Sequence, residues 1–111
     1  MIYTADFVAG DTLTQYIRQL LDSGTNTPIP LSGTTVTLNL YNTSSNTTYP
    51  TTAAISHTMT ITDIPSSIVS YQFQSGDLVG PYLWATIKVA NSLGQTVTQT
   101  NPEVFIVRPR L

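Results

Sequence analysis

Hydrophobic and polar residues alternate along several short stretches of the chain, and this alternation predicts β-strands. The clearest stretch is "GTTVTLNLYN" (33–42), in which Val36, Leu38 and Leu40 fall on one face and polar residues fall on the other. Since successive side chains of a strand point to opposite faces, such a strand buries one face only. Further strands are predicted within residues 53–62, 67–73 and 82–90, and one or two closing strands are predicted within residues 95–100 and 103–108.

The segment "GDTLTQYIRQLLDSG" (10–24) fits two kinds of element. Its apolar residues fit helical spacing between a possible capping aspartate and a glycine: Leu13, Ile17, Leu20 and Leu21. Three of these residues, Leu13, Ile17 and Leu21, also fit the alternation of apolar and polar residues that is typical of a strand. Because turn signals recur every eight to twelve residues downstream, we expect a strand over residues 12–21 and keep a helix as the alternative.

Together these patterns predict an all-β fold. We expect an immunoglobulin-like antiparallel β-sandwich of about seven strands. The length of 111 residues suits a single domain over residues 1–111 with short terminal extensions. Five alternating apolar residues are expected to be core: Val36, Leu38, Leu40, Ile87 and Val89.

Charge is scarce, and this excludes several classes of partner. Charged residues make up 9% of the chain, against about 25% in typical domains. Four dispersed basic residues and a net charge of -2 disfavour nucleic acid and an acidic membrane surface. The absence of cysteine excludes disulfides and thiolate metal sites. The N-terminal sequence lacks the pattern of a secretory signal, and no stretch approaches the roughly 20 apolar residues of a membrane span.

The stretch "QSGDLVGPYLWATIKV" (74–89) places Asp77, Gly80 and Tyr82 just before a strand. In immunoglobulin-like domains a tyrosine at this point turns its hydroxyl back to the chain upstream and closes a corner. An aspartate can cap the turn, and a glycine supplies permissive dihedral angles. The spacing therefore predicts a structural corner rather than a catalytic loop.

Trp84, the only tryptophan, follows this corner. Strict alternation puts it on the outer face with Tyr82, opposite Leu83 and Ala85. Either a bulge brings the tyrosine inward, or the corner analogy fails and Trp84 is partly exposed. A partly exposed tryptophan would be a candidate interface anchor. The alternative is that Trp84 covers one end of the core.

The sequence indicates no reaction chemistry. His57 is the only histidine and has no recognisable catalytic partners, because Ser and Thr are too common here to be informative. The aspartates fall at predicted turns, where capping is their usual role. We therefore expect no catalytic residue, no metal site and no cofactor.

Three stretches resemble the N-terminal domain of phage baseplate upper proteins. They are "AGDTLTQYIRQLLDSGTNTPIPLSGTTVTLNL", "VSYQFQSGDLVGPYLWATIKV" and "GQTVTQTNPEVFIV", and together they cover most of residues 7–108. The chain departs from the family's pattern at two places. "LSG" replaces a more usual acidic turn, and Trp84 adds a residue to the last block.

The resemblance implies a non-enzymatic virion structural protein that is assembled in the host bacterial cytoplasm. It would be a tail, baseplate or tail-fibre adaptor, or a capsid decoration subunit, with other virion proteins and further copies of itself as partners. The alternative is a carbohydrate-binding β-sandwich on a virion or cell surface.

The chain ends carry apolar residues, which is unusual for termini. One hypothesis is that they dock on a neighbouring subunit, with Ile2, Tyr3 and Leu111 as anchors and Arg108 or Arg110 as rim contacts. The other is that both ends fold back on their own sandwich.

Overall fold

The computed structural model describes residues 7–22, 24–44, 47, 55–100 and 102–108, and within these residues it contains strands and turns but no helix. The strands are β1 (Phe7–Val8), β2 (Gln15–Gln19), β3 (Thr35–Thr43), β4 (Ile55–Thr58), β5 (Thr60–Asp63), β6 (Ile68–Gln72), β7 (Tyr82–Ala90), β8 (Thr96–Gln99) and β9 (Glu103–Arg108).

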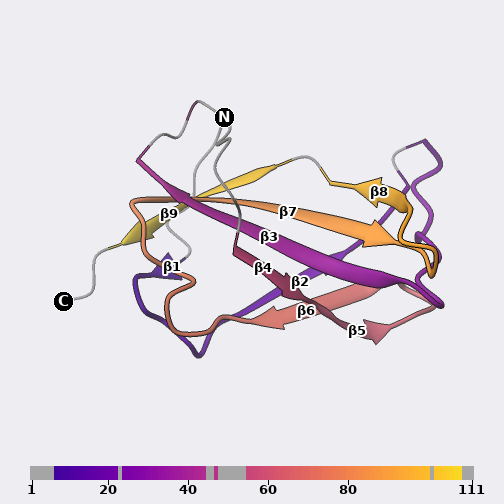
Figure 1. Cartoon of the computed structure of the whole chain (residues 1–111), viewed down its shortest axis with the longest axis horizontal. Coiled ribbons are helices and arrows are strands. Elements are labelled where there is room, and N and C mark those ends of the chain that lie inside the picture. Colours follow the sequence, from indigo (N-terminus) through magenta and orange to yellow (C-terminus); the bar gives the residue numbers. More distant parts are fainter. Residues whose placement is uncertain (1–6, 23, 45–46, 48–54, 101, 109–111) are drawn as a thin grey trace.

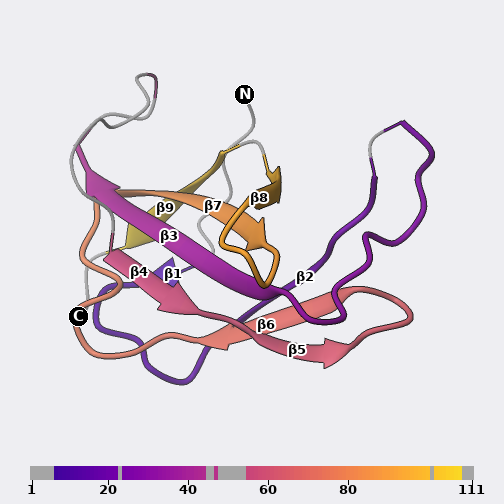
Figure 2. The ribbon, with the colours of Figure 1, turned by 45° about the vertical axis from the view of Figure 1, so that its right-hand side comes forward.

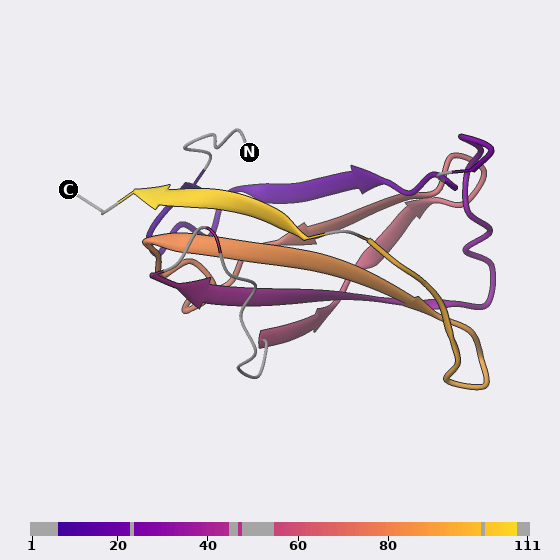
Figure 3. The ribbon, with the colours of Figure 1, turned by 90° about the horizontal axis from the view of Figure 1, so that it is seen from above.

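The strands form two sheets that face each other as a β-sandwich (Figures 1 and 2). The larger sheet has six strands in the order β1-β9-β7-β3-β4, with β8 also paired to β7. The smaller sheet has the order β2-β6-β5. The longest ladder joins β3 to β7 from Thr35–Ala90 to Thr43–Tyr82 without a register shift, and it forms the middle of the larger sheet (Figure 3).

The prediction of one strand within residues 53–62 is wrong, because the chain changes sheets there. β4 pairs with β3 in the larger sheet, and β5 pairs with β6 in the smaller one. Met59 lies between them, is buried, and donates its backbone N–H to Val36 O at 2.8 Å. Because of this crossing, the short β1 and the separate β8 and β9, the described residues contain nine strands rather than about seven.

Residues 15–19 form a strand, as expected, but its inward face is not the one with Leu13 and Ile17. Leu13 is 86% exposed and Ile17 is also exposed, whereas Tyr16 and Leu20 are buried. The Tyr16 ring lies edge-on to the rings of Phe73 and Phe105, which come from distant parts of the chain. The large aromatic ring therefore fills the core, and the aliphatic side chains of Leu13 and Ile17 face solvent.

The core lies between the two sheets and contains all five residues expected there. Leu38 and Leu40 of β3 and Ile87 and Val89 of β7 are almost completely buried. Phe7 packs against Phe73 and Phe105 with ring centroids 4.9 Å apart in both pairs. These contacts join β1 and β9 of the larger sheet to the chain that follows β6.

A polar clamp, formed by Tyr16, Arg18 and Glu103, links β2 of the smaller sheet to β9 of the larger one. Arg18 Nε and Nη2 donate to the two Glu103 carboxylate oxygens, each at 2.9 Å, and the Tyr16 hydroxyl donates to Oε1. The guanidinium also lies 4.3 Å from the Tyr16 ring centroid. Burial raises the pKa of Glu103, but the hydrogen bonds from Arg18 and Tyr16 outweigh it and hold the pKa below its ordinary value.

The clamp predicts an acid-sensitive contribution to stability. A carboxylate whose pKa is lower in the folded state stabilises the fold above its unfolded pKa and loses that effect as the pH falls through the folded pKa. The free energy of unfolding should therefore fall as the pH drops below the ordinary glutamate value of 4.5. Glu103→Gln should flatten this slope in urea titrations at a series of pH values. Asp22→Asn, which removes one exposed carboxylate away from the clamp, is the control, and equal slopes in both variants would contradict the prediction.

Candidate interaction site

The loop between β6 and β7 is folded around the carboxylate of Asp77, which is 2% exposed. The Asp77 N–H donates to Gln74 O at 3.1 Å, and Gln74 N–H donates to Asp77 Oδ2 at 2.8 Å. Asp77 therefore caps its own turn, because the side chain and the backbone both bond to the residue three positions earlier.

Two side chains from different sheets complete the environment of Asp77. The Tyr71 hydroxyl, from β6, donates to Oδ2 at 2.6 Å, and His57 Nε2, from β4, lies 2.8 Å from Oδ1. The His57 and Tyr71 rings are stacked with centroids 4.7 Å apart. Burial raises the pKa of Tyr71, and its hydrogen bond to the carboxylate raises it further. The hydroxyl thus stays protonated and remains a donor.

Asn42, near the end of β3, fixes the rest of the loop. Its Nδ2 donates to Asp77 O at 2.8 Å, and its Oδ1 accepts from the N–H groups of Val79 at 3.0 Å and Gly80 at 3.1 Å. Gly80 has a φ of 87°, and the peptide bond to Pro81 is cis. A Cβ at Gly80 would lie 3.1 Å from both Cβ and O of Val107, so the loop approaches β9 closely.

The structure brings two of the three predicted corner residues together. Asp77 and Gly80 lie in this loop, whereas Tyr82 begins β7, where it pairs with Thr43 and Ile106. The tyrosine whose hydroxyl reaches Asp77 is Tyr71, six residues before the aspartate rather than five after it.

The sequence did not identify His57, Tyr71 or Asn42 as members of this cluster. A signal was present, since His57 and Tyr71 fall at the same-face positions as apolar residues of their strands and a partly buried imidazole needs a polar partner. No local pattern shows that their partner is Asp77. The cluster itself acts to hold the loop, because both carboxylate oxygens of Asp77 are occupied by protein groups.

The anchored loop and the segment beside it form one end of the sandwich, which we call the corner end and define as residues 8–14 and 73–81. Hydrogen bonds join its two parts: Gly10 N–H donates to Leu78 O and Phe73 N–H donates to Thr14 O. Three apolar side chains of the corner end face solvent: Val8, Leu13 and Val79. Leu13 is 86% exposed and Val79 is 60% exposed.

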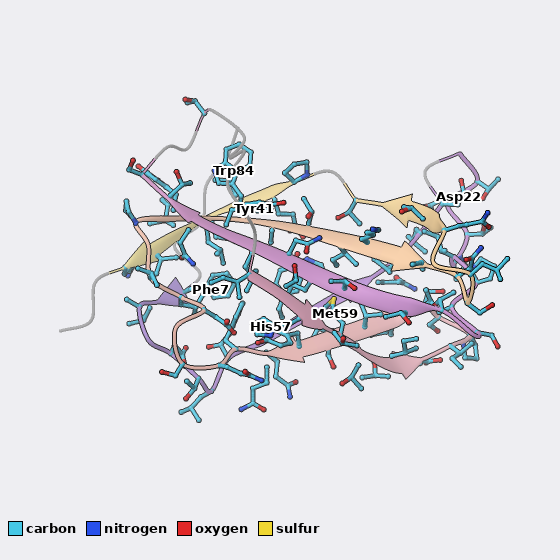
Figure 4. All side chains as sticks on the ribbon, in the orientation of Figure 1. Phe7, Asp22, Tyr41, His57, Met59 and Trp84 are labelled. Carbon is cyan, nitrogen blue, oxygen red and sulfur yellow. The ribbon has the colours of Figure 1, made fainter. Side chains whose placement is uncertain are left out.

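A second apolar set lies on the outer face of the larger sheet. Trp84 of β7 pairs with Tyr41 of β3 and Val104 of β9, and all three point away from the core residues Leu83 and Ala85. Figure 4 shows Trp84 and Tyr41 on the side of the sheet away from His57 and Met59. We call Tyr41, Trp84, Thr86, Val104 and Ile106 the outer patch.

The outer patch is largely buried, although it is separate from the core. Trp84 is 5% exposed, Val104 is 8% exposed and Thr86 is 1% exposed. The β3–β7 ladder contains no bulge between Tyr82 and Ala85, so the inward turn of Tyr82 that such a bulge would allow does not occur. Trp84 is outward-facing and buried, and it does not belong to the core cluster.

The predicted terminal contacts are placed only in part. Arg108, the last residue of β9, is exposed and pairs with Val8. Ile2, Tyr3, Arg110 and Leu111 lie outside the described residues.

Comparisons with models of known protein families, with curated proteins and with solved structures found no match. Within the described part of the chain, no group of three or more His, Asp or Glu residues is placed to hold a metal ion. In the same residues there is no helix of the length and apolar character needed to cross a membrane. The exposed apolar side chains of the corner end are a candidate contact surface.

We expect the close approach of Gly80 to β9 to make Gly80→Ala strongly destabilising. The substitution places a Cβ against Val107 and also disfavours the positive φ. Gly76→Ala is a matched control, because Gly76 has a φ of 90° but nothing within 4 Å of the position that its Cβ would occupy. Urea unfolding should show a larger loss for Gly80→Ala, by at least about 1 kcal/mol. Equal losses would mean that the loop can move away from Val107.

We expect the Tyr71 hydroxyl to contribute through Asp77. Tyr71→Phe removes one donor from a buried carboxylate, which should cost about 1–3 kcal/mol of unfolding free energy. A double-mutant cycle with Asp77→Asn tests the pairing, because contacting residues show coupling of at least about 0.5 kcal/mol. Additive losses in the cycle would show that the two side chains act separately.

Proposed function

We propose that the chain is an immunoglobulin-like, non-enzymatic structural protein of a bacteriophage virion that acts through protein–protein contacts. The immunoglobulin-like assignment is supported by the division of the strands between the sheets. β2, β5 and β6 share one sheet, and β3, β7 and β9 share the other with β4 beside β3. In immunoglobulin-like sandwiches, the second, fourth and fifth strands likewise lie in one sheet, and the third, sixth and seventh strands lie in the other.

The exposed apolar side chains of the corner end carry the proposal of a contact function. Val8 of β1, Leu13 of the following segment and Val79 of the loop that Asp77 anchors all face solvent, and the Gly10–Leu78 hydrogen bond joins that segment to that loop. Exposed apolar side chains on segments that hydrogen bonds hold together are candidates for a protein contact. Because the chain has so few charges, such a contact would rely on shape and apolar burial.

The virion assignment is supported by the resemblance of residues 7–108 to the N-terminal domain of phage baseplate upper proteins. In that setting the chain would be a tail or baseplate adaptor, or a capsid decoration subunit. Its partners would be other virion proteins and further copies of itself.

Particle composition tests this function. In a phage that encodes the chain, we expect the protein to be present in purified particles at a fixed copy number, measured by quantitative mass spectrometry. Leu13→Ser/Val79→Ser should fold, as judged by circular dichroism, but be lost from the particles. Leu93→Ser is a matched control, because Leu93 is 81% exposed in the turn between β7 and β8.

Two results would contradict the proposal. The wild-type protein could be absent from the particles, which would reject the virion role. The double variant could be incorporated as well as the wild type, which would reject the corner end as the contact. Specific binding of the isolated chain to glycans would instead favour the carbohydrate-binding alternative.

A further inference from the structure

The outer edge of β2 is a row of backbone groups with no partner strand among the described residues. β2 ends the smaller sheet, in which it pairs only with β6 within the described part of the chain (Figure 3). Phe73 N–H donates to Thr14 O, and Leu20 N–H donates to Ser67 O, so the even-numbered residues of this segment bond toward β6. Backbone N–H and C=O groups therefore point away from β6 at the three odd-numbered positions of β2: Gln15, Ile17 and Gln19.

This free edge is limited to the length of β2. Beyond it, Leu21 forms a bridge with Pro28, and Ile29 N–H donates to Leu20 O at 3.0 Å, so a hairpin closes the same side of the strand. Along the free edge, the side chains of the outer face are exposed and uncharged, and that of Ile17 is 50% exposed.

Arg18 lies over the middle of the free edge. Its Nη1 donates to the backbone O of Ile17 at 2.8 Å, while its Nε and Nη2 are held by Glu103. A second strand could not pair with Ile17 without displacing or desolvating the guanidinium, and charged side chains protect many natural edge strands in this way. The polar clamp thus holds a charge against the one described edge position that a pairing strand would need most.

The other sheet edges are protected by different means. The β5–β6 register shifts between Ile61 and Asp63, and Asp63 adds a charge to β5. β1 has two residues, and β4 and β8 have four each. Bulges, charges and short length all discourage pairing with another chain. β2 has five residues, a regular register with β6 and no proline, so Arg18 is its main protection.

We infer that β2 is a strand-pairing site for a second copy of this chain and that Arg18 keeps the site closed in the wild type. This inference concerns the isolated chain and does not depend on the proposed function. An antiparallel pair of two β2 strands centred on Ile17 places the two Ile17 side chains opposite each other and each Gln15 opposite Gln19 of the other copy. The aliphatic side chains shield each other from water, and the amides can exchange hydrogen bonds.

The symmetry of β2 favours a second copy over an unrelated strand. The outward-facing residues are evenly spaced about Ile17, so a twofold pairing uses every outward-facing N–H and C=O group. No like charges meet, because Arg18 lies opposite Tyr16 of the other copy. A ladder of five residues is small beside stable interfaces, which bury roughly 1,200–2,000 Å², so the dimer should dissociate on dilution.

Sedimentation velocity over a range of protein concentrations tests this inference. The wild type should remain a monomer. Arg18→Met/Glu103→Gln removes the charge from the edge and leaves no unpaired carboxylate on β9, so it should form a dimer that dissociates on dilution. Circular dichroism shows whether this double variant is folded, and Arg18→Gln replaces it if it is not.

Glu103→Gln alone is the matched control, because it breaks the ion pair but keeps the guanidinium at the edge. It should remain a monomer. If it dimerises as readily as the double variant, or if the wild type is already a dimer, Arg18 does not keep the site closed. If the double variant stays monomeric at every concentration, β2 is not a pairing site and the inference is overturned.

Lysine substitutions in the double variant locate the contact. Ile17→Lys places two positive charges opposite each other across the twofold axis and should restore the monomer. Ile64→Lys is its control, because Ile64 is 51% exposed, like Ile17, but follows β5 at the far side of the smaller sheet. An equal loss of the dimer in both variants would overturn β2 as the contact.

Cross-linking tests the register, because the chain has no cysteine of its own. In the double variant, Ile17→Cys would place two thiols on opposite residues whose Cα atoms are about 5.5 Å apart, which a disulfide can span. Gln19→Cys is the control, because its two copies would lie four residues apart, about 13 Å along the paired strands. Oxidation should link Ile17→Cys into a dimer but not Gln19→Cys. Equal linking, or none, would overturn the pairing centred on Ile17.

Discussion

Burial of β7 on both faces is the constraint on which the rest of the structure depends. β7 is paired with β3 along its whole length on one side and with β8 and β9 on the other, so its backbone hydrogen bonds are made within the sheet. Its inner face carries Leu83, Ala85, Ile87 and Val89 into the core. Its outer face carries Trp84 and Thr86, which are also buried. The smaller sheet supplies the layer over the inner face, as expected for a strand that is buried rather than solvated.

The scarcity of charge makes the few ionised groups structurally important. Glu103 and Arg18 join the two sheets at one edge, and Asp77 holds the loop that leads into β7. Asp77 is buried, yet protein donors reach both of its oxygens, which offsets the loss of hydration. Removal of one partner from such a group is more unfavourable than replacement of the whole set, so these positions tolerate little variation. Thr, Ser, Asn and Gln supply most of the remaining polar surface.

The parts of the fold that could be predicted are those with a local signal. The alternation in β3 and β7 identified their core residues, because the neighbouring polar residues face away from the core. The inward face of β2 was not predictable in this way, since Tyr16 is buried by Phe73 and Phe105, which are distant in sequence. The crossing at Met59 had no local signal either, because alternation continues through residues 55–61 although the chain leaves one sheet for the other. Asp77 caps a turn, as predicted, but the choice of Tyr71 as its partner depends on which strand faces the loop in the folded sandwich.

The two apolar surfaces of the chain differ in how they are presented. Val79 is exposed on a loop that Asp77 and Asn42 hold by hydrogen bonds to the backbone, and Leu13 is exposed on the segment that the Gly10–Leu78 hydrogen bond joins to that loop. Trp84, in contrast, is buried on the outer face of the larger sheet. Binding through pre-organised loops orders few additional groups, which reduces the entropic cost of association. Contacts of this kind can be individually weak and still hold a subunit in place when many copies act together. A charge-poor corner end held by hydrogen bonds is therefore suited to the virion contact that we propose.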